Sequence, residues 1–521
     1  MRGAVAAGHP LTAEAGARLL TEGGNAFDAC IAAAFASWVV EGPLSGPGGG
    51  GFLLAHRAGH QSARLLDFFV AAPGIGAATP PAPMETIEVD FDGETSQAFR
   101  IGSASCAVPG SAAGLAAAHR AYASLPWGVL LEPAIELARR GYEVTAAQAY
   151  LHEVLDCILR HTDEGRRVYG HDGGPFRKGE LVVSPNLADT LETIADGGAD
   201  AIYRGELGAA LVQHLAETGG SVTAQDLEAY RPVWRRPVTV PYRGRDIVSN
   251  PPPSAGGVLI AYGLRLLDEL APAEAEPGSS EEIARLAAVM GEQLRARAEP
   301  TFARSLYRGG LARRLCSDES VRDGVRRIGS SIPAPAAAAP RGTTHISVVD
   351  AAGNAASLSS SIGSGSGMVV PGTGIHLNNM LGEADLQASP GATRPGRRLT
   401  SMMAPSIVLE TRRPRLVVGS AGSARLRGAI MQIIVNVVGH GLPVHEAIAR
   451  PRIHAEGDRV HCEGGFAAEE LDVLERLGLD VVRWRRRNLF FGGAAAVELR
   501  EDGTLAAAGD PRRGGHGVVV K

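Results

Sequence analysis

Apolar residues near the start of the chain are spaced as in two helices that precede a strand. Leu11–Leu20 predicts a helix, and Ala26–Val40 is apolar on nearly all sides, which predicts a buried helix. Asn25 is a suitable N-cap for this second helix. Phe52–His56 predicts a strand directly after the glycine-rich run Ser45–Gly51.

The rest of the chain continues this mixture of helices and strands. Residues 107–230 have mostly helical patterns, and strand patterns return at Val238–Tyr242 and Asp246–Ser249. Helical patterns then extend to about Ile328, where the alanine-proline tract Ser330–Arg341 begins to break the pattern. Helices and strands in both halves favour stacked layers of helix and sheet.

A second strand-rich region follows the alanine-proline tract. Ile346–Asp350 predicts a strand, residues 351–354 predict a turn, and Ala355–Ile362 predicts the next strand. Leu426–Gly439 predicts a long helix, and short strands continue to the end of the chain.

Gly342 and Thr343 lie between the alanine-proline tract and the first of these strands. A cut before Thr343 would place a hydroxyl and a free α-amine on one residue, and an α-amine titrates at about 7.7–8.0. Thr343 would then be a nucleophile that carries its own base. The alternative is an ordinary threonine at the head of a strand.

Composition narrows the class of protein. The chain has 521 residues, of which 45% are hydrophobic and 21% charged, and its net charge of -5 argues against a nucleic-acid or membrane-surface partner. Ala26–Val40, the longest apolar helix, contains Asp28 and is too short to span a bilayer. No signal peptide is recognisable at the N-terminus, so we expect a cytoplasmic protein.

Metal and cofactor chemistry is not indicated by the sequence. The five cysteines are scattered without CxxC spacing, and His445, His454 and His461 are irregularly spaced. Gly46, Gly48 and Gly51 match GxGxxG, but the strand follows the glycines instead of preceding them. Tight backbone packing beside an active site is the better interpretation. The basic run 483–487 is interpreted as a solvated edge strand.

Several segments, in this order and spacing, resemble the γ-glutamyltransferase (glutathione hydrolase) family of the N-terminal-nucleophile superfamily. The resemblance covers nearly the whole chain. The matching segments are GHPLTAEAGARLLTEGGNAFDA (8–29), GPGGGGF (46–52), AVPGSAAGL (107–115), LLEPAIELARRGY (130–142), GGADAIYRGELG (197–208), PPPSAGG (251–257), TTHISVVDAAGNAASL (343–358), PGTGIHLNN (371–379) and GDPRRGG (509–515).

The resemblance implies an α+β fold, a four-layer αββα sandwich, and an inactive precursor that cuts itself between Gly342 and Thr343. A large chain (1–342), ending in the linker 330–342, and a small chain (343–521) would stay associated as one compact unit. The implied partner is a small-molecule substrate.

The resemblance also implies catalytic roles. Thr343 corresponds to the nucleophile, and Ser361 falls near a second hydroxyl that hydrogen-bonds it, although a serine in this run could instead be ordinary loop. Gly422 and Ser423 match a glycine pair whose backbone N–H groups stabilise the oxyanion, and a side chain at 423 leaves such a donor intact.

The family's substrate residues are matched less closely. Thr400 and Ser401 correspond to a serine pair that binds the substrate carboxylate; the alternative is a plain turn beside two core methionines. Glu383 replaces the aspartate that holds the substrate's α-amine, and Met380 replaces a glutamine.

Phe69 is the largest departure, because it stands where the family has an arginine that grips the α-carboxylate of the glutamyl group. Loss of a charge-assisted hydrogen bond costs about 1.5–3 kcal/mol. The pocket is therefore expected to be more apolar than a standard glutamyl site. Arg397, Arg398 and Arg425 are candidates for a substitute cation.

Three functions are compatible with the sequence. The leading one is a self-processing hydrolase or transferase of γ-glutamyl-like amides. The second is a relative that cleaves a carbon–carbon bond in the biosynthesis of alkyl-proline units of antibiotics, since such relatives also lack the arginine. The third is a non-catalytic paralogue that binds a ligand, against which the retained Thr343 argues.

Overall fold

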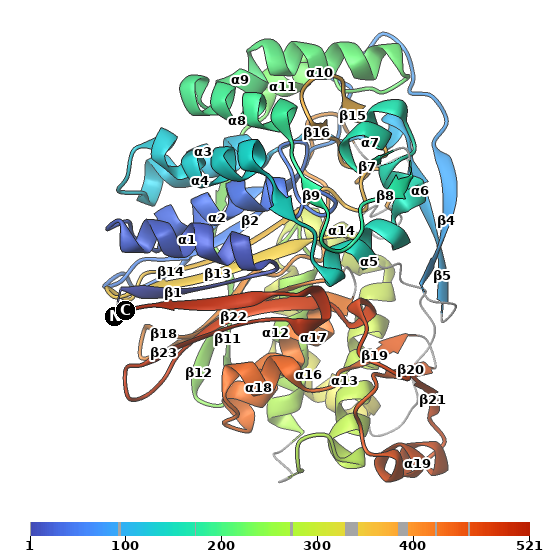
Figure 1. Cartoon of the computed structure of the whole chain (residues 1–521). Coiled ribbons are helices and arrows are strands. Elements are labelled where there is room, and N and C mark those ends of the chain that lie inside the picture. Colours follow the sequence, from blue (N-terminus) through green and yellow to red (C-terminus); the bar gives the residue numbers. More distant parts are fainter. Residues whose placement is uncertain are drawn as a thin grey trace.

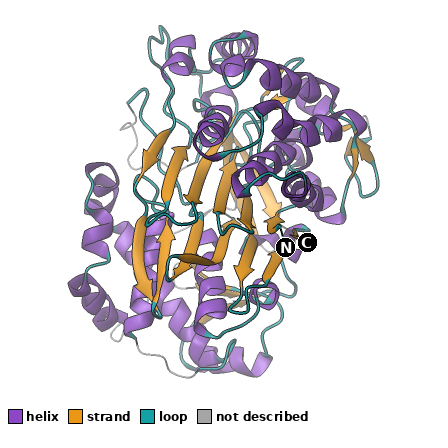
Figure 2. Ribbon diagram, turned by 90° about the vertical axis from the view of Figure 1, so that its left-hand side faces the viewer, coloured by secondary structure: helices purple, strands orange, loops and turns teal. Residues whose placement is uncertain are grey.

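Two antiparallel sheets lie face to face at the centre of the molecule, and helices cover the outer face of each (Figures 1 and 2). The computed structural model describes residues 2–91, 95–171, 173–270, 275–328, 342–383, 394–422, 425–456 and 459–521. The first sheet has the order β10 (Val233–Arg235), β3 (Arg64–Phe68), β2 (Gly50–His56), β14 (Ala355–Ser361), β13 (Thr344–Asp350), β1 (Gly3–Ala7), β24 (His516–Val520). The second has the order β11 (Val238–Tyr242), β12 (Arg245–Ser249), β17 (Ser406–Glu410), β18 (Arg413–Ala421), β22 (Gly493–Leu499), β23 (Leu505–Gly509).

Helix α2 (Ala26–Val40) is central to the helical layer on the first sheet. All of its residues are buried, which explains why its sequence is apolar on every side. The Asn25 side chain accepts hydrogen bonds from the N–H groups of Phe27 and Asp28, and the Asp28 carboxylate accepts one from the Asn25 N–H. The predicted helix and its cap are confirmed. The same layer contains α1 (Pro10–Thr21), α3 (Ser111–Tyr122), α4 (Trp127–Arg140) and α8 (Pro185–Gly197).

Helix α12 (Gly256–Glu269) lies on the second sheet and contacts β11 and β12. The helix predicted at Leu426–Gly439 is α17 (Leu426–Ile434), continued by a π-helical turn at Val435–Gly439. Around these lie α13 (Ser280–Ala298), α14 (Pro300–Arg308), α15 (Leu311–Leu315), α16 (Asp318–Ile328) and α18 (Val444–Ala449). The four-layer αββα sandwich is confirmed.

Shorter elements surround the sandwich, and the hairpin of β4 (Glu85–Phe91) and β5 (Thr95–Ile101) stands at the right-hand edge of Figure 1. The basic run fits the expected edge strand only in part, since Arg483 ends the edge strand β21 (Asp480–Arg483) and residues 485–487 are exposed beyond it. Trp484, by contrast, is buried against Phe490. The remaining elements are β6 (Tyr142–Glu143), α5 (Ala146–Val154), α6 (Asp156–Leu159), α7 (Asp163–Val168), β7 (Gly170–His171), β8 (Gly174–Pro175), β9 (Leu181–Val182), α9 (Asp200–Tyr203), α10 (Glu206–Glu217), α11 (Ala224–Ala229), β15 (Val369–Val370), β16 (Ile375–His376), β19 (Ile453–Glu456), β20 (Arg459–Cys462), α19 (Ala468–Arg476) and β21 (Asp480–Arg483).

The chain termini and the head of β13 lie at opposite ends of the sandwich. Gly3 pairs with both Asp350 and Val520, which places the termini beside the tail of β13 (Figure 1). At the other end, Ser361 closes β14 and pairs with Gly50. The alanine-proline tract Ser330–Arg341 lies outside the described residues.

Candidate active site

Thr343 directly precedes β13 and is 4% exposed. Side chains alternate along β13, and His345 and Ser347 face the second sheet: a Cβ on Gly419 would lie 2.2 Å from the His345 ring, and Ser347 Oγ donates to the Ala495 carbonyl (3.1 Å). Thr343 belongs to the same face. Burial lowers the pKa of His345 to about 3, so its imidazole is neutral.

Two hydroxyl groups meet at the Gly342 carbonyl oxygen in the uncut chain. Thr343 Oγ1 donates to it at 2.8 Å, and Ser361 Oγ donates to it at 2.5 Å. The Gly363 N–H in turn donates to Ser361 Oγ (2.8 Å), which orients that hydroxyl. The structure therefore brings Gly342, Thr343 and Ser361 together at the expected cleavage site. The role of Ser361 beside the nucleophile of the processed enzyme stays a prediction.

Arg513 contacts the backbone carbonyl of Thr343. Its Nη1 donates to the Thr343 carbonyl (3.0 Å), and burial lowers the pKa of its guanidinium to about 10, against the favourable charges of Asp510 and Glu41. Arg513 lies within the segment GDPRRGG (509–515), and no role was predicted for it. The only sequence signal for it was that family motif.

Glu41 is a second residue that the sequence analysis missed. Its carboxylate accepts hydrogen bonds from Thr344 Oγ1 (2.6 Å) and Thr12 Oγ1 (2.7 Å). Burial raises the pKa of Glu41, an effect that these hydroxyls and Arg513 oppose. Thr344 points to the helical layer, opposite to Thr343, so its bond to Glu41 anchors the head of β13 to that layer.

The glycine run packs against the strand that carries Ser361. A Cβ on Gly49 would lie 2.4 Å from the Ser361 carbonyl oxygen, one on Gly51 would lie 2.2 Å from that of Ser359, and one on Gly48 would lie 2.3 Å from that of His376. Real Cβ atoms do not approach backbone oxygen so closely. The interpretation as tight backbone packing is confirmed, and the glycines position Ser361.

We expect Gly49→Ala to slow self-cleavage and to lower the free energy of unfolding by about 1–3 kcal/mol, the usual cost of overpacking. The new Cβ would push the Ser361 segment away from Gly342. Fraction cut on a denaturing gel and urea unfolding measure the two effects. Gly128→Ala in α4 is the matched control, because a Cβ there meets no atom within 4 Å. Equal behaviour of the two variants would contradict the packing role.

The oxyanion segment begins where β18 ends, at the same end of the sandwich as Thr343. Gly422 has a φ of 119°, and a Cβ on it would lie 2.9 Å from Gly492 Cα. Glycine is therefore required at 422 for both conformation and space. Ser423 lies outside the described residues, so its backbone N–H stays a prediction.

The Phe69 segment lies beside the Thr400–Ser401 segment. The Leu399 N–H donates to the Val70 carbonyl (3.1 Å), and Ser254 Oγ donates to the Ser401 carbonyl (2.9 Å). Ser401 Oγ accepts a hydrogen bond from the Met403 N–H (3.0 Å), and Thr400 and Ser401 are both buried. The fold thus joins two segments that are 330 residues apart in the chain and that the sequence analysis assigned to one substrate pocket.

The Phe69 side chain is 1% exposed and stacks on Phe52, with ring centroids 5.4 Å apart. It belongs to an apolar cluster that also contains Met380, Leu399 and Met402. An arginine would have to bury its charge in this position.

Arg398 acts as a clamp on the Phe69 segment. Its Nη1 donates to the Phe69 carbonyl (2.6 Å), its Nε lies 3.2 Å from Asp67 Oδ1, and its guanidinium carbon lies 4.6 Å from the Tyr230 ring centre. Arg397 lies over the Tyr307 ring (3.4 Å), and Arg425 lies over Phe490 (4.3 Å). Arg398 is thus committed to backbone and Asp67, which is a different task from the substitute cation considered above.

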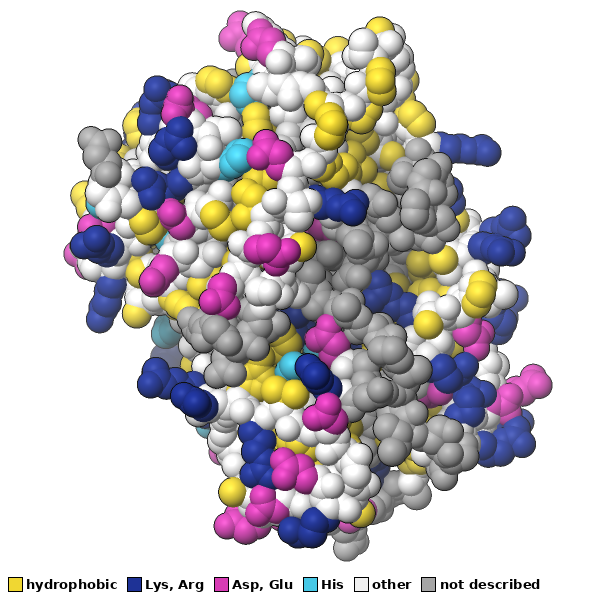
Figure 3. Space-filling model, turned by 90° about the vertical axis from the view of Figure 1, so that its right-hand side faces the viewer, with side chains coloured by type: hydrophobic (Ala, Val, Ile, Leu, Met, Phe, Trp, Pro, Cys, Tyr) yellow, Lys and Arg dark blue, Asp and Glu magenta, His cyan; other side chains and the backbone are white. Residues whose placement is uncertain are grey.

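Glu383 lies over the turn that follows Ser361. A Cβ on Gly363 would lie 2.7 Å from Glu383 Oε1, and Glu383 is 5% exposed. The Asn379 side chain spans the same turn, accepting from the Ser364 N–H at 3.0 Å. The structure therefore brings Glu383 to the site. Figure 3 turns the face opposite the termini toward the viewer, where apolar and basic side chains are both visible near the middle.

Within the part of the chain that the structure describes, no cluster of His, Cys, Asp and Glu side chains is suited to a metal ion. No described helix is both long enough and apolar enough to cross a bilayer.

Four layers with a buried threonine at the head of a central strand define an N-terminal-nucleophile hydrolase. The gamma-glutamyltranspeptidase family model matches residues 12–520, so the chain belongs to that family. The resemblance noted in the sequence and the assignment as an enzyme are confirmed.

Named relatives include both hydrolases of glutathione and acylases. The chain is 31% identical to the glutathione hydrolase proenzyme of Escherichia coli, over 98% of this chain and 90% of that protein. It is also 31% identical to the acylase ACY 1 proenzyme of Pseudomonas sp. strain SE83, over 100% of this chain and 94% of that protein. The crystal structure of cephalosporin acylase from Bacillus halodurans superposes with a TM-score of 0.85 at 27% identity, over 99% of this chain and 95% of that one.

Proposed function

We propose that the chain cuts itself between Gly342 and Thr343 and that Thr343 then transfers the acyl group of a small amide to water or to an amine. The observation that carries this proposal is the pair of hydroxyls at the Gly342 carbonyl oxygen, one on Thr343 and one on Ser361. The proenzyme relatives support the same order of events.

Self-cleavage would begin with attack of Thr343 Oγ1 on the Gly342 carbonyl carbon. The carbonyl oxygen becomes negative in this step, and the Ser361 hydroxyl is placed to stabilise it. The C–N bond then breaks, the nitrogen takes up the proton that Oγ1 gives up, and an ester joins Gly342 to Thr343 Oγ1. Water hydrolyses this ester, which releases the Gly342 carboxylate and restores the Thr343 hydroxyl beside the α-amine that the previous step freed. Arg513 holds the Thr343 carbonyl throughout.

In the cut enzyme the α-amine would accept the Oγ1 proton while Oγ1 attacks the substrate carbonyl. An acyl-Thr343 ester forms and the amine leaves; a second nucleophile, water or an amine, then resolves the ester. The backbone N–H groups at Gly422 and Ser423 are proposed to hold the oxyanion, since Gly422 lies at the same end of the sandwich.

The acyl group is proposed to be γ-glutamyl-like in length but more apolar. Phe69 and Met380 belong to one apolar cluster beside Thr400 and Ser401, while Glu383 supplies a carboxylate near Ser361. A substrate α-carboxylate would find hydroxyl donors but no arginine at position 69. Relatives named as acylases are as similar to this chain as those named as glutathione hydrolases.

A panel of p-nitroanilides tests this proposal. We expect kcat/KM for the hexanoyl derivative to exceed that for the γ-glutamyl derivative by about one to two orders of magnitude, because one charge-assisted bond worth about 1.5–3 kcal/mol is missing for the carboxylate. Glutaryl-p-nitroanilide, which keeps the carboxylate and lacks the amine, separates the two groups.

Phe69→Arg should shift this preference toward the γ-glutamyl derivative, and Phe69→Leu, which keeps the site apolar, should leave it unchanged. Faster turnover of the γ-glutamyl derivative by the unaltered protein would contradict the apolar pocket while leaving self-cleavage intact. No shift in Phe69→Arg, with folding preserved, would place position 69 outside the carboxylate site.

A further inference from the structure

A groove of about 1100 Å³ runs along the open edge where the two sheets are joined by the passage from β10 to β11. The turn Pro251–Pro253, helices α14 and α15, and residues 397–398 complete its walls. No aspartate or glutamate of the described chain lines the groove. Six arginines line it: Arg235, Arg236, Arg265, Arg313, Arg397 and Arg398.

Only part of this positive charge is neutralised within the protein. Arg235 and Arg398 share the buried Asp67 carboxylate (2.7 and 3.2 Å), and Arg265 bonds Asp318 (2.7 Å). Arg236 and Arg313 are exposed and pair with no carboxylate of the described chain. This concentration of cations contrasts with the net charge of -5 of the chain. A groove lined with one sign of charge concentrates ligands of the opposite sign.

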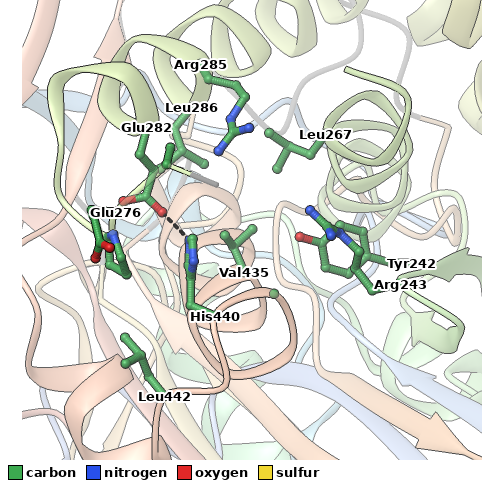
Figure 4. Close-up of a pocket in the computed structure, with 13 residues that line it drawn as sticks. Tyr242, Arg243, Leu267, Glu276, Glu282, Arg285, Leu286, Val435, His440 and Leu442 are labelled. Atoms are coloured by element: carbon green, nitrogen blue, oxygen red, sulfur yellow. Dashed lines mark hydrogen bonds and ion pairs between the residues drawn. The ribbon is translucent and has the colours of Figure 1, made fainter. Parts of the chain in front are cut away.

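A second hollow offers a contrast, because both signs of charge line it. The hollow in Figure 4, of about 470 Å³, lies near the Tyr242 end of β11 and mixes the two signs of charge. His440 bonds Glu282 (2.7 Å) within it, and Arg243 lies 3.7 Å from Asp268. His440 and Arg243 thus lie near carboxylates of the protein, whereas Arg236 and Arg313 of the arginine groove are left for the carboxylates of a ligand.

The groove has an apolar floor beneath its arginines. Val238, Val240, Leu306 and Leu311 line it and are nearly buried, and prolines 251–253 form one side. A ligand that suits both features carries carboxylates on short methylene stems. Guanidinium groups bind carboxylates with two parallel hydrogen bonds, and the stems would rest on the apolar floor.

The groove also adjoins the proposed substrate pocket. Arg397 and Arg398 are separated from Thr400 and Ser401 in the chain only by Leu399. Pro253 directly precedes Ser254, whose Oγ donates to the Ser401 carbonyl (2.9 Å). Tyr307, a lining residue, donates through its hydroxyl to the Arg398 carbonyl (3.2 Å). A ligand in the groove would therefore contact the segment that carries the predicted carboxylate-binding hydroxyls.

We propose that this arginine groove is a binding site for an acidic peptide, a chain with several carboxylates on short stems. The proposal concerns binding alone, so it can fail or succeed independently of the reaction at Thr343. The protein is acidic overall, which favours a peptide over a nucleic acid.

Fluorescence anisotropy with labelled hexaglutamate tests the proposal on the full-length protein. We expect saturable binding that weakens as salt is raised, and a Kd about fivefold or more higher for the double variant Arg236→Ala/Arg313→Ala, since two exposed charge pairs are lost. The matched control is Arg486→Ala/Arg487→Ala, which removes the same charge from exposed positions outside the groove and should stay within about twofold of the unaltered protein.

Three results would overturn the proposal. They are the absence of hexaglutamate binding, an equal loss in the groove and control variants, and tighter binding of a labelled thymidine hexanucleotide, which would assign the groove to phosphates. Unfolding midpoints of both double variants should match that of the unaltered protein, because all four arginines are exposed. Repeating the titration with Thr343→Ala separates binding from turnover, and binding should persist there.

Discussion

Thr343→Ala is expected to remain one uncut chain and to lose amide hydrolysis by about 10⁶-fold, the scale of losing a catalytic nucleophile. The variant lacks the hydroxyl that lies 2.8 Å from the Gly342 carbonyl oxygen. The chain therefore cannot cut itself, and no acyl-enzyme can form. A denaturing gel and N-terminal sequencing measure the cut, which in the unaltered protein should expose Thr343. Release of p-nitroaniline measures the hydrolysis.

Two further variants sharpen this prediction. Thr343→Ser keeps a hydroxyl and should still be cut, whereas Thr301→Ala, on an exposed position of α14, should be cut at the normal rate. A fully cut Thr343→Ala protein would contradict the mechanism. An uncut but active protein would separate catalysis from processing and would also contradict the role of a free α-amine.

Ser361→Ala is expected to slow self-cleavage by about 10²–10³-fold, the usual effect of removing one oxyanion donor. Its hydroxyl donates to the Gly342 carbonyl oxygen, where negative charge develops when Thr343 Oγ1 attacks. Precursor made by cell-free translation allows the cut to be followed against time on a gel.

Ser360→Ala is the matched control, because its hydroxyl lies 3.3 Å from Ser45 Oγ and belongs to the opposite face of β14. It should be cut at close to the normal rate. Cutting of Ser361→Ala at the rate of Ser360→Ala would show that other donors stabilise the Gly342 oxyanion.

The fold was largely predictable because local patterns and layer rules agree. Ala26–Val40 is apolar on all sides and has Asn25 before it, so its burial and its start follow from the sequence. The strand pair around the turn 351–354 follows equally well. The π-helical turn at Val435–Gly439 was missed, since its pattern is the same as that of an α-helix.

The candidate site was predictable only where a motif carried it. Gly342, Thr343 and Ser361 are joined by two short strands that pair locally, so their meeting at one carbonyl follows from sequence and register. Glu41 and Arg513 reach Thr344 and Thr343 from about 300 and 170 residues away, and no local pattern reports such contacts. The contacts of Arg398 were likewise not predictable from the sequence, because Asp67 and the Phe69 carbonyl approach its guanidinium only in the folded chain.

The strand order of the first sheet predicts that the proposed cut before Thr343 would be hard to reverse by refolding. β13 and β14 belong to the proposed small chain and lie between β1 and β2 of the proposed large chain, while β24 of the small chain pairs with β1. Neither fragment has a complete sheet without the other. The precursor forms these pairings within one molecule, but the cut protein would have to form them between two, so its refolding yield should fall on dilution. The proposed cut would thus replace reversible folding by a persistent, kinetically trapped assembly.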